Sequence, residues 1–231
     1  MRRRSLLCAL VIGVAGANRV AVANPPSKVA VFGDSLADGL WAGLSQVCPD
    51  VSLVRLARVS SGLVKTGFYD WPAEAARIAA EPYAAGIACV GLNDQQTIAT
   101  ASGRFPFGTD DWDAAYAGRV ADIVKGFVAH RLPLLWVGLP RVRDPQIASG
   151  VTRINGIFER VVPSAGGVFV PTWDFTSGPH GFDEYLPDET GRKVNMRAAD
   201  GSHFTPEGYR FLARQVLARL RPDDRLKALI S

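Results

Sequence analysis

Short apolar runs alternate along the chain with segments whose apolar residues recur every three or four positions. Apolar runs bounded by turn residues are typical of buried strands, and the three- to four-residue spacing is typical of amphipathic helices. We therefore predict strands at residues 28–33, 51–59, 85–91, 134–139 and 167–170. The predicted helices are a segment carrying Leu36, Leu40 and Leu44, residues 71–81, 109–130 and 147–162, and a last helix that begins after Thr205-Pro206-Glu207.

This alternation of strands and helices indicates parallel βαβ units, and hence an α/β fold with a doubly wound parallel sheet. In such a sheet, ligands bind beyond the carboxyl ends of the strands. Residues 172–199 break the alternation with a polar stretch that contains proline and glycine. We expect this excursion to form a β-hairpin around residues 188–191 and to pass close to the turn that precedes the last helix.

The composition agrees with one globular domain. The chain has 231 residues, of which 48% are hydrophobic and 21% charged. These fractions exclude a disordered, collagen-like or disulfide-scaffold protein. Glycine and proline are spread along the chain, and no internal repeat is present.

The first residues have a composition of their own. Three arginines at positions 2–4 precede an apolar run of about a dozen residues, and Ala21-Val22-Ala23 forms a small-x-small cleavage site. This arrangement is typical of a secretory signal peptide. An uncleaved membrane anchor is the alternative, but the run is shorter than the ~20 residues that span a bilayer. We expect residues 1–23 to be removed and residues 24–231 to form a periplasmic or secreted domain without a stable membrane anchor.

Cleavage would change the charge balance. The full chain has 26 Lys and Arg against 22 Asp and Glu, a formal net charge of +4. Residues 1–23 contain four arginines and no acidic residue, so the mature domain would carry 22 basic and 22 acidic residues. Binding to nucleic acid or to an anionic membrane then has no support from composition.

Two segments carry the groups that a nucleophilic mechanism needs. Ser35 directly follows the first strand and begins a predicted helix, where backbone N–H groups and the helix dipole favour negative charge; a plain helix cap is the alternative. Asp200 lies three residues before His203, so its carboxylate can orient the imidazole and stabilise its protonated form. Of the other histidines, His130 ends a predicted helix and His180 lies in a Gly-Pro loop. His203 is therefore the best candidate for a base.

Two further strand ends carry hydrogen-bond donors. Gly62 follows the second strand, and Asn93 follows the third. Each position is also compatible with an ordinary turn. If the Gly62 N–H and the Asn93 amide both point at the space above Ser35, they would stabilise a tetrahedral oxyanion.

Four segments resemble, in order, the four sequence blocks of the SGNH (GDSL) hydrolases: Gly33-Asp34-Ser35-Leu36, Gly62, Gly91-Leu92-Asn93-Asp94 and Asp200-Gly201-Ser202-His203. The resemblance covers about residues 28–220 and implies a three-layer, flavodoxin-like fold with five parallel strands. It implies Ser35 as nucleophile, His203 as base and Asp200 as the acid that orients it. The implied oxyanion hole consists of the Ser35 and Gly62 N–H groups and the Asn93 amide. Residues 107–112, 136–140 and 197–205 are similar to an exported bacterial subfamily known only as a domain of unknown function, DUF459.

Other residues at the strand ends are candidates for substrate binding: Asp94, Arg141, Arg143 and Trp173. Trp112 and Trp136 fall on apolar helix and strand positions, so we expect them in the core. No HExxH, P-loop or dinucleotide motif suggests a metal or cofactor. Cys48 and Cys89 lie in no CxxC pair and beside no histidine, so neither a thiol catalyst nor a zinc site is expected.

The expected function is that of an exported serine esterase that removes acyl groups, in particular O-acetyl groups from an envelope or extracellular glycan. The glycan is an expectation by analogy. A lysophospholipase, thioesterase, arylesterase or acyltransferase would use the same residues. A binding or assembly protein that keeps the fold without turnover is the alternative from another class. The polar residues of the excursion at 172–199 favour a polar acceptor over a lipid chain, unless the excursion is only a solvated surface hairpin.

Overall fold

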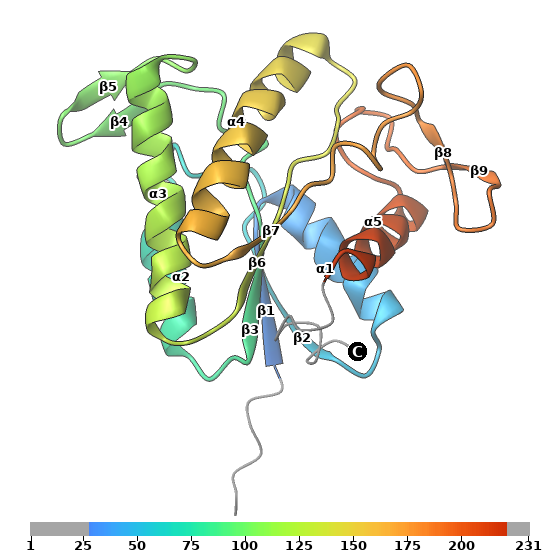
Figure 1. The fold of residues 1–231 in the computed structure, drawn as a ribbon, viewed down its shortest axis with the longest axis horizontal. Helices are drawn as coiled ribbons and strands as arrows, with labels where there is room; N and C mark the ends of the chain where they lie inside the picture. The colour runs from blue at the N-terminus through green and yellow to red at the C-terminus, as the bar shows by residue number, and fades with distance from the viewer. Residues whose placement is uncertain (1–27, 221–231) are drawn as a thin grey trace, which may run out of the picture.

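The computed structural model describes residues 28–220, and the predicted signal peptide and its cleavage site lie outside them. A parallel sheet forms the middle of three layers (Figure 1). Its strands follow the order β2-β1-β3-β6-β7, which is the predicted flavodoxin-like order. The five strands are β1 (Lys28–Gly33), β2 (Ser52–Ala57), β3 (Ala85–Cys89), β6 (Leu134–Val137) and β7 (Val168–Val170).

Five helices cover the two faces of the sheet (Figure 1). The first face carries α1 (Ser35–Val47) and α5 (Pro206–Ala218), and the second carries α2 (Trp71–Ala80), α3 (Asp110–Ala129) and α4 (Pro145–Ser164). Each helix begins after a residue whose side chain accepts a hydrogen bond from an N–H of the first turn. The capping residues are Asp34, Asp70, Thr109, Asp144 and Thr205.

The core lies on both sides of the sheet. Trp112 and Trp136 are fully buried, as predicted, and so is Trp71. The rings of Phe32 on β1 and Phe127 on α3 are stacked with their centroids 5.5 Å apart. Burial of side chains of this size stabilises the fold by roughly 1.5–3 kcal/mol each.

Helices α1 and α5 pack closely against each other where two glycines of α1 face Tyr209 of α5. A Cβ at Gly39 would lie 1.9 Å from the Tyr209 ring, and a Cβ at Gly43 would lie 2.2 Å from the Tyr209 carbonyl oxygen. Only glycine at both positions permits this approach. Because Ser35 begins α1 and His203 lies just before α5, the contact joins the two elements that carry these residues.

Two antiparallel hairpins stand outside the sheet, near the end at which the parallel strands finish (Figure 1). Strands β8 (Tyr185–Pro187) and β9 (Lys193–Asn195) form the hairpin expected around residues 188–191. The Asp188 carboxylate closes its turn by accepting hydrogen bonds from two backbone N–H groups of that turn. Strands β4 (Ile98–Thr100) and β5 (Gly103–Phe105) form a hairpin that was not predicted.

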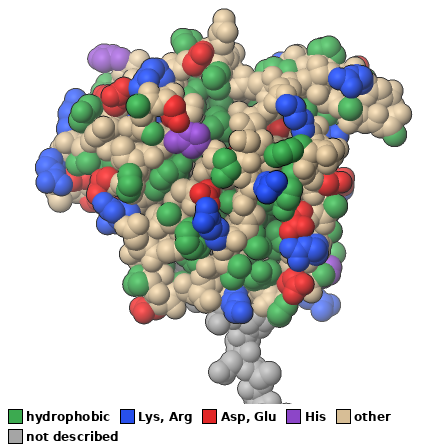
Figure 2. Space-filling view, turned by 180° about the vertical axis from the view of Figure 1, so that it is seen from behind, with side chains coloured by type: hydrophobic (Ala, Val, Ile, Leu, Met, Phe, Trp, Pro, Cys, Tyr) green, Lys and Arg blue, Asp and Glu red, His purple; other side chains and the backbone are tan. Residues whose placement is uncertain are grey.

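The surface carries intermixed charge. Figure 2 shows lysine and arginine side chains interspersed with aspartate and glutamate over one face of the molecule. On that face no large patch of a single sign is visible, which agrees with the balanced charge expected for the mature domain. Between residues 28 and 220 there is no helix with the length and apolar character needed to cross a bilayer.

Candidate active site

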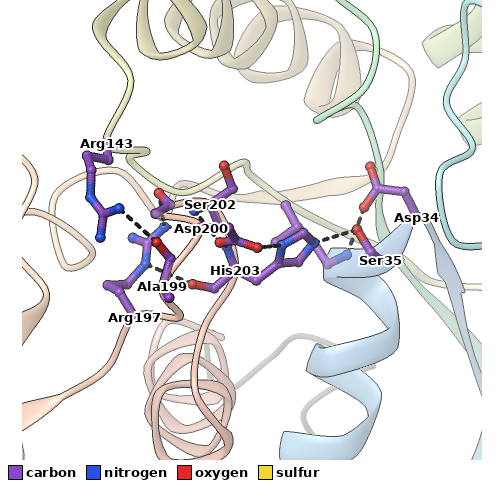
Figure 3. Close-up of polar contacts among 10 residues, drawn as sticks. Asp34, Ser35, Arg143, Arg197, Ala199, Asp200, Ser202 and His203 are labelled. Carbon is purple, nitrogen blue, oxygen red and sulfur yellow. Dashed lines mark hydrogen bonds and ion pairs between the residues drawn. The ribbon is translucent and has the colours of Figure 1, made fainter.

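Ser35, His203 and Asp200 form a continuous chain of hydrogen bonds (Figure 3). Ser35 Oγ lies 2.7 Å from His203 Nε2, and His203 Nδ1 lies 2.7 Å from Asp200 Oδ2. One ring nitrogen thus faces the hydroxyl and the other faces the carboxylate, which is the geometry of a nucleophile, a base and an orienting acid. About a third of the His203 side chain is exposed, so a substrate can reach it.

The Asp200 carboxylate organises the turn that carries His203. Its Oδ1 accepts hydrogen bonds from the N–H groups of Ser202, at 2.8 Å, and of His203, at 2.9 Å. Partial burial alone would raise the pKa of Asp200. The hydrogen bonds from these two N–H groups and from the His203 ring outweigh burial and lower the pKa to about 2. Asp200 is therefore ionised at every pH at which an esterase of this kind would work.

Ser35 owes its position to the residue before it. Asp34 is completely buried and caps α1 by accepting a hydrogen bond from Leu36 N–H at 2.9 Å. Its second carboxylate oxygen accepts hydrogen bonds from the N–H groups of Gly91, at 3.0 Å, and Leu92, at 3.1 Å. Burial raises the pKa of Asp34 to about 6, against the opposing effect of these hydrogen bonds. Asp34 thus ties the start of α1 to the loop after β3, a role for which sequence analysis offered no signal beyond a capping residue.

Three N–H donors are available near the end of β1. Neither the Ser35 N–H nor the Gly62 N–H donates to a protein acceptor within residues 28–220. The Asn93 side-chain amide donates to the Ser61 carbonyl oxygen at 2.9 Å, and its nitrogen carries a second N–H. These are the donors that the sequence predicted for an oxyanion hole.

Asp94 does not reach the substrate side of the loop, contrary to our expectation for a substrate-binding residue. It is 1% exposed, and its carboxylate accepts hydrogen bonds from the N–H groups of Leu63 and Val64 and from the Tyr116 hydroxyl. Burial raises its pKa. The carboxylate therefore holds the chain immediately after Gly62 in place, which is a structural role.

The other three candidates for substrate binding are Arg141, Arg143 and Trp173, and all three contact the excursion at residues 172–199 or belong to it. The Arg143 side chain forms an ion pair with Glu184 and donates to the Ala199 carbonyl oxygen at 2.8 Å, both in the excursion. Its backbone N–H donates to the Gly201 carbonyl oxygen at 3.0 Å, so Arg143 joins the excursion to the turn at residues 200–203. Arg141 lies over the Trp173 ring, with its guanidinium carbon 4.9 Å from the ring centroid. Arg141 and Trp173 line a cleft of about 680 Å³ that is formed largely by residues 173–193, and its lining does not include Ser35, Asp200 or His203.

Arg197 belongs to this site and was not among the predicted site residues. Its side chain is buried, and its guanidinium donates to carbonyl oxygens of the turn that carries His203 (Figure 3). No residue pattern in the sequence indicates this role, because the partners of Arg197 are backbone carbonyl groups.

Within residues 28–220, no group of three or more His, Cys, Asp or Glu side chains is arranged to hold a metal ion. Cys89 is buried in β3, and burial raises the pKa of its thiol. His130 lies at the C-terminal cap of α3, as expected.

Several solved structures share this fold. A lipase/acylhydrolase from Enterococcus faecalis aligns with a TM-score of 0.56 and 14% identity, over 85% of this chain and 98% of its own. A GDSL-like lipase from Bacteroides thetaiotaomicron aligns with a TM-score of 0.53 and 14% identity, over 85% and 90%. A peptidoglycan O-acetylesterase aligns with a TM-score of 0.51 and 15% identity, over 71% of this chain and 44% of its own. At these identities the likeness establishes the fold, and it confirms the predicted SGNH (GDSL) hydrolase architecture.

No curated protein matches the sequence. The model of one family, described as "Protein of unknown function (DUF459)", matches residues 28–219, which is most of the chain and all of the central sheet. The protein therefore belongs to the DUF459 family and has the fold of the SGNH hydrolases.

Proposed function

We propose that this protein is an exported serine esterase that hydrolyses acyl esters with Ser35, His203 and Asp200. The observation that carries the proposal is the unbroken chain from Ser35 Oγ through both His203 ring nitrogens to Asp200, with both links at 2.7 Å. A hydroxyl, an imidazole and an ionised carboxylate in this order are the groups that acyl transfer requires.

The reaction follows from this geometry. His203 Nε2 takes the proton of the Ser35 hydroxyl while Oγ attacks the carbonyl carbon of the ester. The carbonyl oxygen becomes an oxyanion, which the N–H groups of Ser35, Gly62 and Asn93 stabilise. When the tetrahedral intermediate collapses, the protonated His203 gives its proton to the leaving alcohol. Water, deprotonated by His203, then attacks the acyl carbon; the bond to Ser35 Oγ breaks, the acid leaves, and His203 returns the proton to Oγ.

We further propose that the acyl group is small, an acetyl group in particular, and that the alcohol is a sugar hydroxyl. The cleft beside Arg141 and Trp173 supports a polar acceptor. Aromatic rings pack against the apolar faces of sugars, and the charged groups of the cleft, which include Asp174, Asp183 and Lys193, offer partners for hydroxyl groups. The peptidoglycan O-acetylesterase among the structures that share the fold is consistent with this acceptor, as is the export expected from residues 1–23.

The serine assignment is tested with a fluorophosphonate probe, which reacts with an activated serine. We expect wild-type protein to be labelled at Ser35 and Ser35→Ala to remain unlabelled. Ser35→Ala should also lose ester hydrolysis by ~10⁴-fold or more, as triad variants typically do, while its thermal unfolding is unchanged. An unlabelled wild-type protein would instead favour a binding or assembly function.

The substrate class is tested with a series of p-nitrophenyl esters of increasing chain length, run alongside acetylated glycans. Highest kcat/KM for acetyl esters, with release of acetate from a glycan, supports the proposal. A preference for long acyl chains favours a lysophospholipase or thioesterase, and transfer of the acyl group to an added alcohol favours an acyltransferase. Intact mass of the exported protein, expected to begin at or near Asn24, tests the compartment.

A further inference from the structure

The buried guanidinium of Arg197 is the most unusual group near the turn at residues 200–203, which we call the catalytic turn. The residue is 2% exposed, and among the described residues it forms no ion pair with a carboxylate. Removing a charge from water is strongly unfavourable unless other groups replace the lost hydration. The hydrogen bonds that replace it therefore show what the residue does.

All of these hydrogen bonds go to backbone carbonyl oxygens. Nη2 donates to Ser202 at 3.0 Å and to Gly201 at 3.4 Å, and Nε donates to His203 at 3.3 Å. Nη1 donates to Arg141 at 2.7 Å, in the loop after β6. Three consecutive carbonyl groups of the catalytic turn thus point at one guanidinium.

The same turn is held from its other side by Asp200. The peptide unit between Ser202 and His203 has its carbonyl oxygen on Arg197 and its N–H on Asp200. The preceding unit, between Gly201 and Ser202, is arranged in the same way. Since the N–H and C=O of a trans peptide point in opposite directions, the two side chains together fix the orientation of both peptide planes before His203.

Two aromatic rings pack against the Arg197 guanidinium. Its central carbon lies over the rings of Phe182 and Phe204, 5.0 and 4.3 Å from their centroids. The backbones of Arg197 and Phe204 are also bridged, which closes the base of the turn. A planar cation with several fixed donors matches this arrangement, whereas a lysine ammonium has neither the flat shape nor the forked geometry.

We propose that Arg197 is a positioning residue for catalysis, which aims the His203 ring at Ser35 by fixing the two peptide planes that lead to His203. The inference rests on the proposed function, because it assigns a purpose to the Ser35–His203 contact. A shift of about 1 Å in a catalytic group can cost ~10²-fold in rate without affecting substrate binding. The effect of losing Arg197 should therefore fall on kcat.

The test compares Arg197→Met and Arg197→Lys with a destabilised control, Phe211→Leu. Phe211 belongs to a small separate core with Leu186 and Met196, next to the β8–β9 hairpin, and its ring packs against Phe175. All variants are assayed with p-nitrophenyl acetate at a temperature at which circular dichroism shows them folded. We expect Arg197→Met to lower kcat by ~10²-fold with KM within about threefold of wild type. Arg197→Lys should recover only part of this loss, and Phe211→Leu should keep wild-type kcat.

An NMR measurement tests the role of Arg197 without requiring that the protein turn over a substrate. The proton shared between His203 Nδ1 and Asp200 gives a far-downfield NMR signal when the turn is ordered. We expect the signal in wild type and Phe211→Leu, and its loss or broadening in Arg197→Met. An unchanged signal together with an unchanged kcat in Arg197→Met, or wild-type kcat in Arg197→Lys, overturns the inference. An equal loss in Phe211→Leu also overturns it, since that result would mark a general effect of stability.

These outcomes separate the two proposals. If the wild-type protein is not labelled at Ser35, the proposed function fails, yet the NMR comparison still decides whether Arg197 orders the His203 turn. If labelling succeeds and the Arg197 variants behave as wild type, only the positioning role fails.

Discussion

Gly62 lies directly against the Asp94 carboxylate: a Cβ at Gly62 would be 2.1 Å from Asp94 Oδ1. Asp94 also accepts hydrogen bonds from the two backbone N–H groups that follow Gly62. Its neighbour Asn93 turns the other way and donates to the Ser61 carbonyl oxygen. Adjacent residues on the loop after β3 thus hold the loop after β2 on both sides of Gly62, and the proposed oxyanion donors from the two loops form one rigid unit.

Substitution of Gly62 by alanine should disrupt this unit. The added methyl group has no room beside the carboxylate, and overpacking of this kind typically costs 1–3 kcal/mol. We expect Gly62→Ala to lower both the free energy of unfolding, measured with urea, and kcat for p-nitrophenyl acetate. The matched control is Gly67→Ala, because a Cβ at Gly67 meets nothing within 4 Å. Full activity and stability in Gly62→Ala, which keeps the backbone N–H, would show that the close contact with Asp94 does not hold this loop in place.

Loss of the Asn93 amide should affect the transition state more than substrate binding. One oxyanion donor is typically worth 10²–10³-fold in kcat, so we expect a decrease of this size in Asn93→Ala with little change in KM. Fluorophosphonate labelling of Ser35 should persist at a reduced rate. A change confined to KM would instead assign Asn93 to substrate binding. EDTA should affect neither protein.

The ionisation of Asp200 depends on the turn that it organises. Its pKa of about 2 in the folded protein lies below the ordinary value, so its contribution to stability is complete above about pH 4 and is lost as the pH falls toward 2. In His203→Ala the pKa of Asp200 should rise toward the ordinary value, because the hydrogen bond from the ring is removed. Carbon-13 NMR of the labelled carboxyl group measures both values. Equal pKa values in the two proteins would contradict the Asp200–His203 contact.

Arg141 should contribute to binding of the acceptor and little to cleavage of the ester bond. Its guanidinium rests on Trp173 at the cleft, while its backbone is held by Thr176 and Arg197, so Arg141→Ala removes a cleft donor without removing those contacts. We expect kcat/KM for an acetylated glycan to fall by roughly tenfold, and by much less for p-nitrophenyl acetate. Arg160→Ala, an exposed arginine on α4, is the control. Equal losses on both substrates would remove the cleft from the proposed acceptor site.

Sequence patterns predicted the architecture well because each strand of the sheet has its own apolar run, and each helix has its own periodicity and capping residue. The parallel strands, the five helices and the β8–β9 hairpin all have local signals of this kind. The β4–β5 hairpin was missed because its strands have only three residues each, too few to show alternation. Strands β3 and β6 end two residues earlier than predicted, at Cys89 and Val137, because the apolar pattern continues into the loops that follow them.

Side-chain direction was harder to predict than position. The loop after β3 was correctly placed beside Ser35, but nothing in the sequence indicates that Asp94 points inward. Its partners Leu63, Val64 and Tyr116 lie 22 to 31 residues away. The hydrogen bonds from Arg197 to main-chain carbonyl groups could not be predicted either, because every residue type has the same carbonyl group and the sequence therefore gives no sign of the partner.

The glycine contact between α1 and α5 has a consequence for how such a protein can change. Ser35 and His203 are 168 positions apart in the chain, yet the helices adjoining them touch through Gly39, Gly43 and Tyr209. Their separation is thus set within one layer of the molecule, whereas the cleft that we propose for the acceptor is built from the excursion before α5. Exchange of residues 178–193 for those of a relative, with Phe182 retained because its ring lies over Arg197, should therefore change the acceptor specificity and leave the Ser35–His203 contact intact.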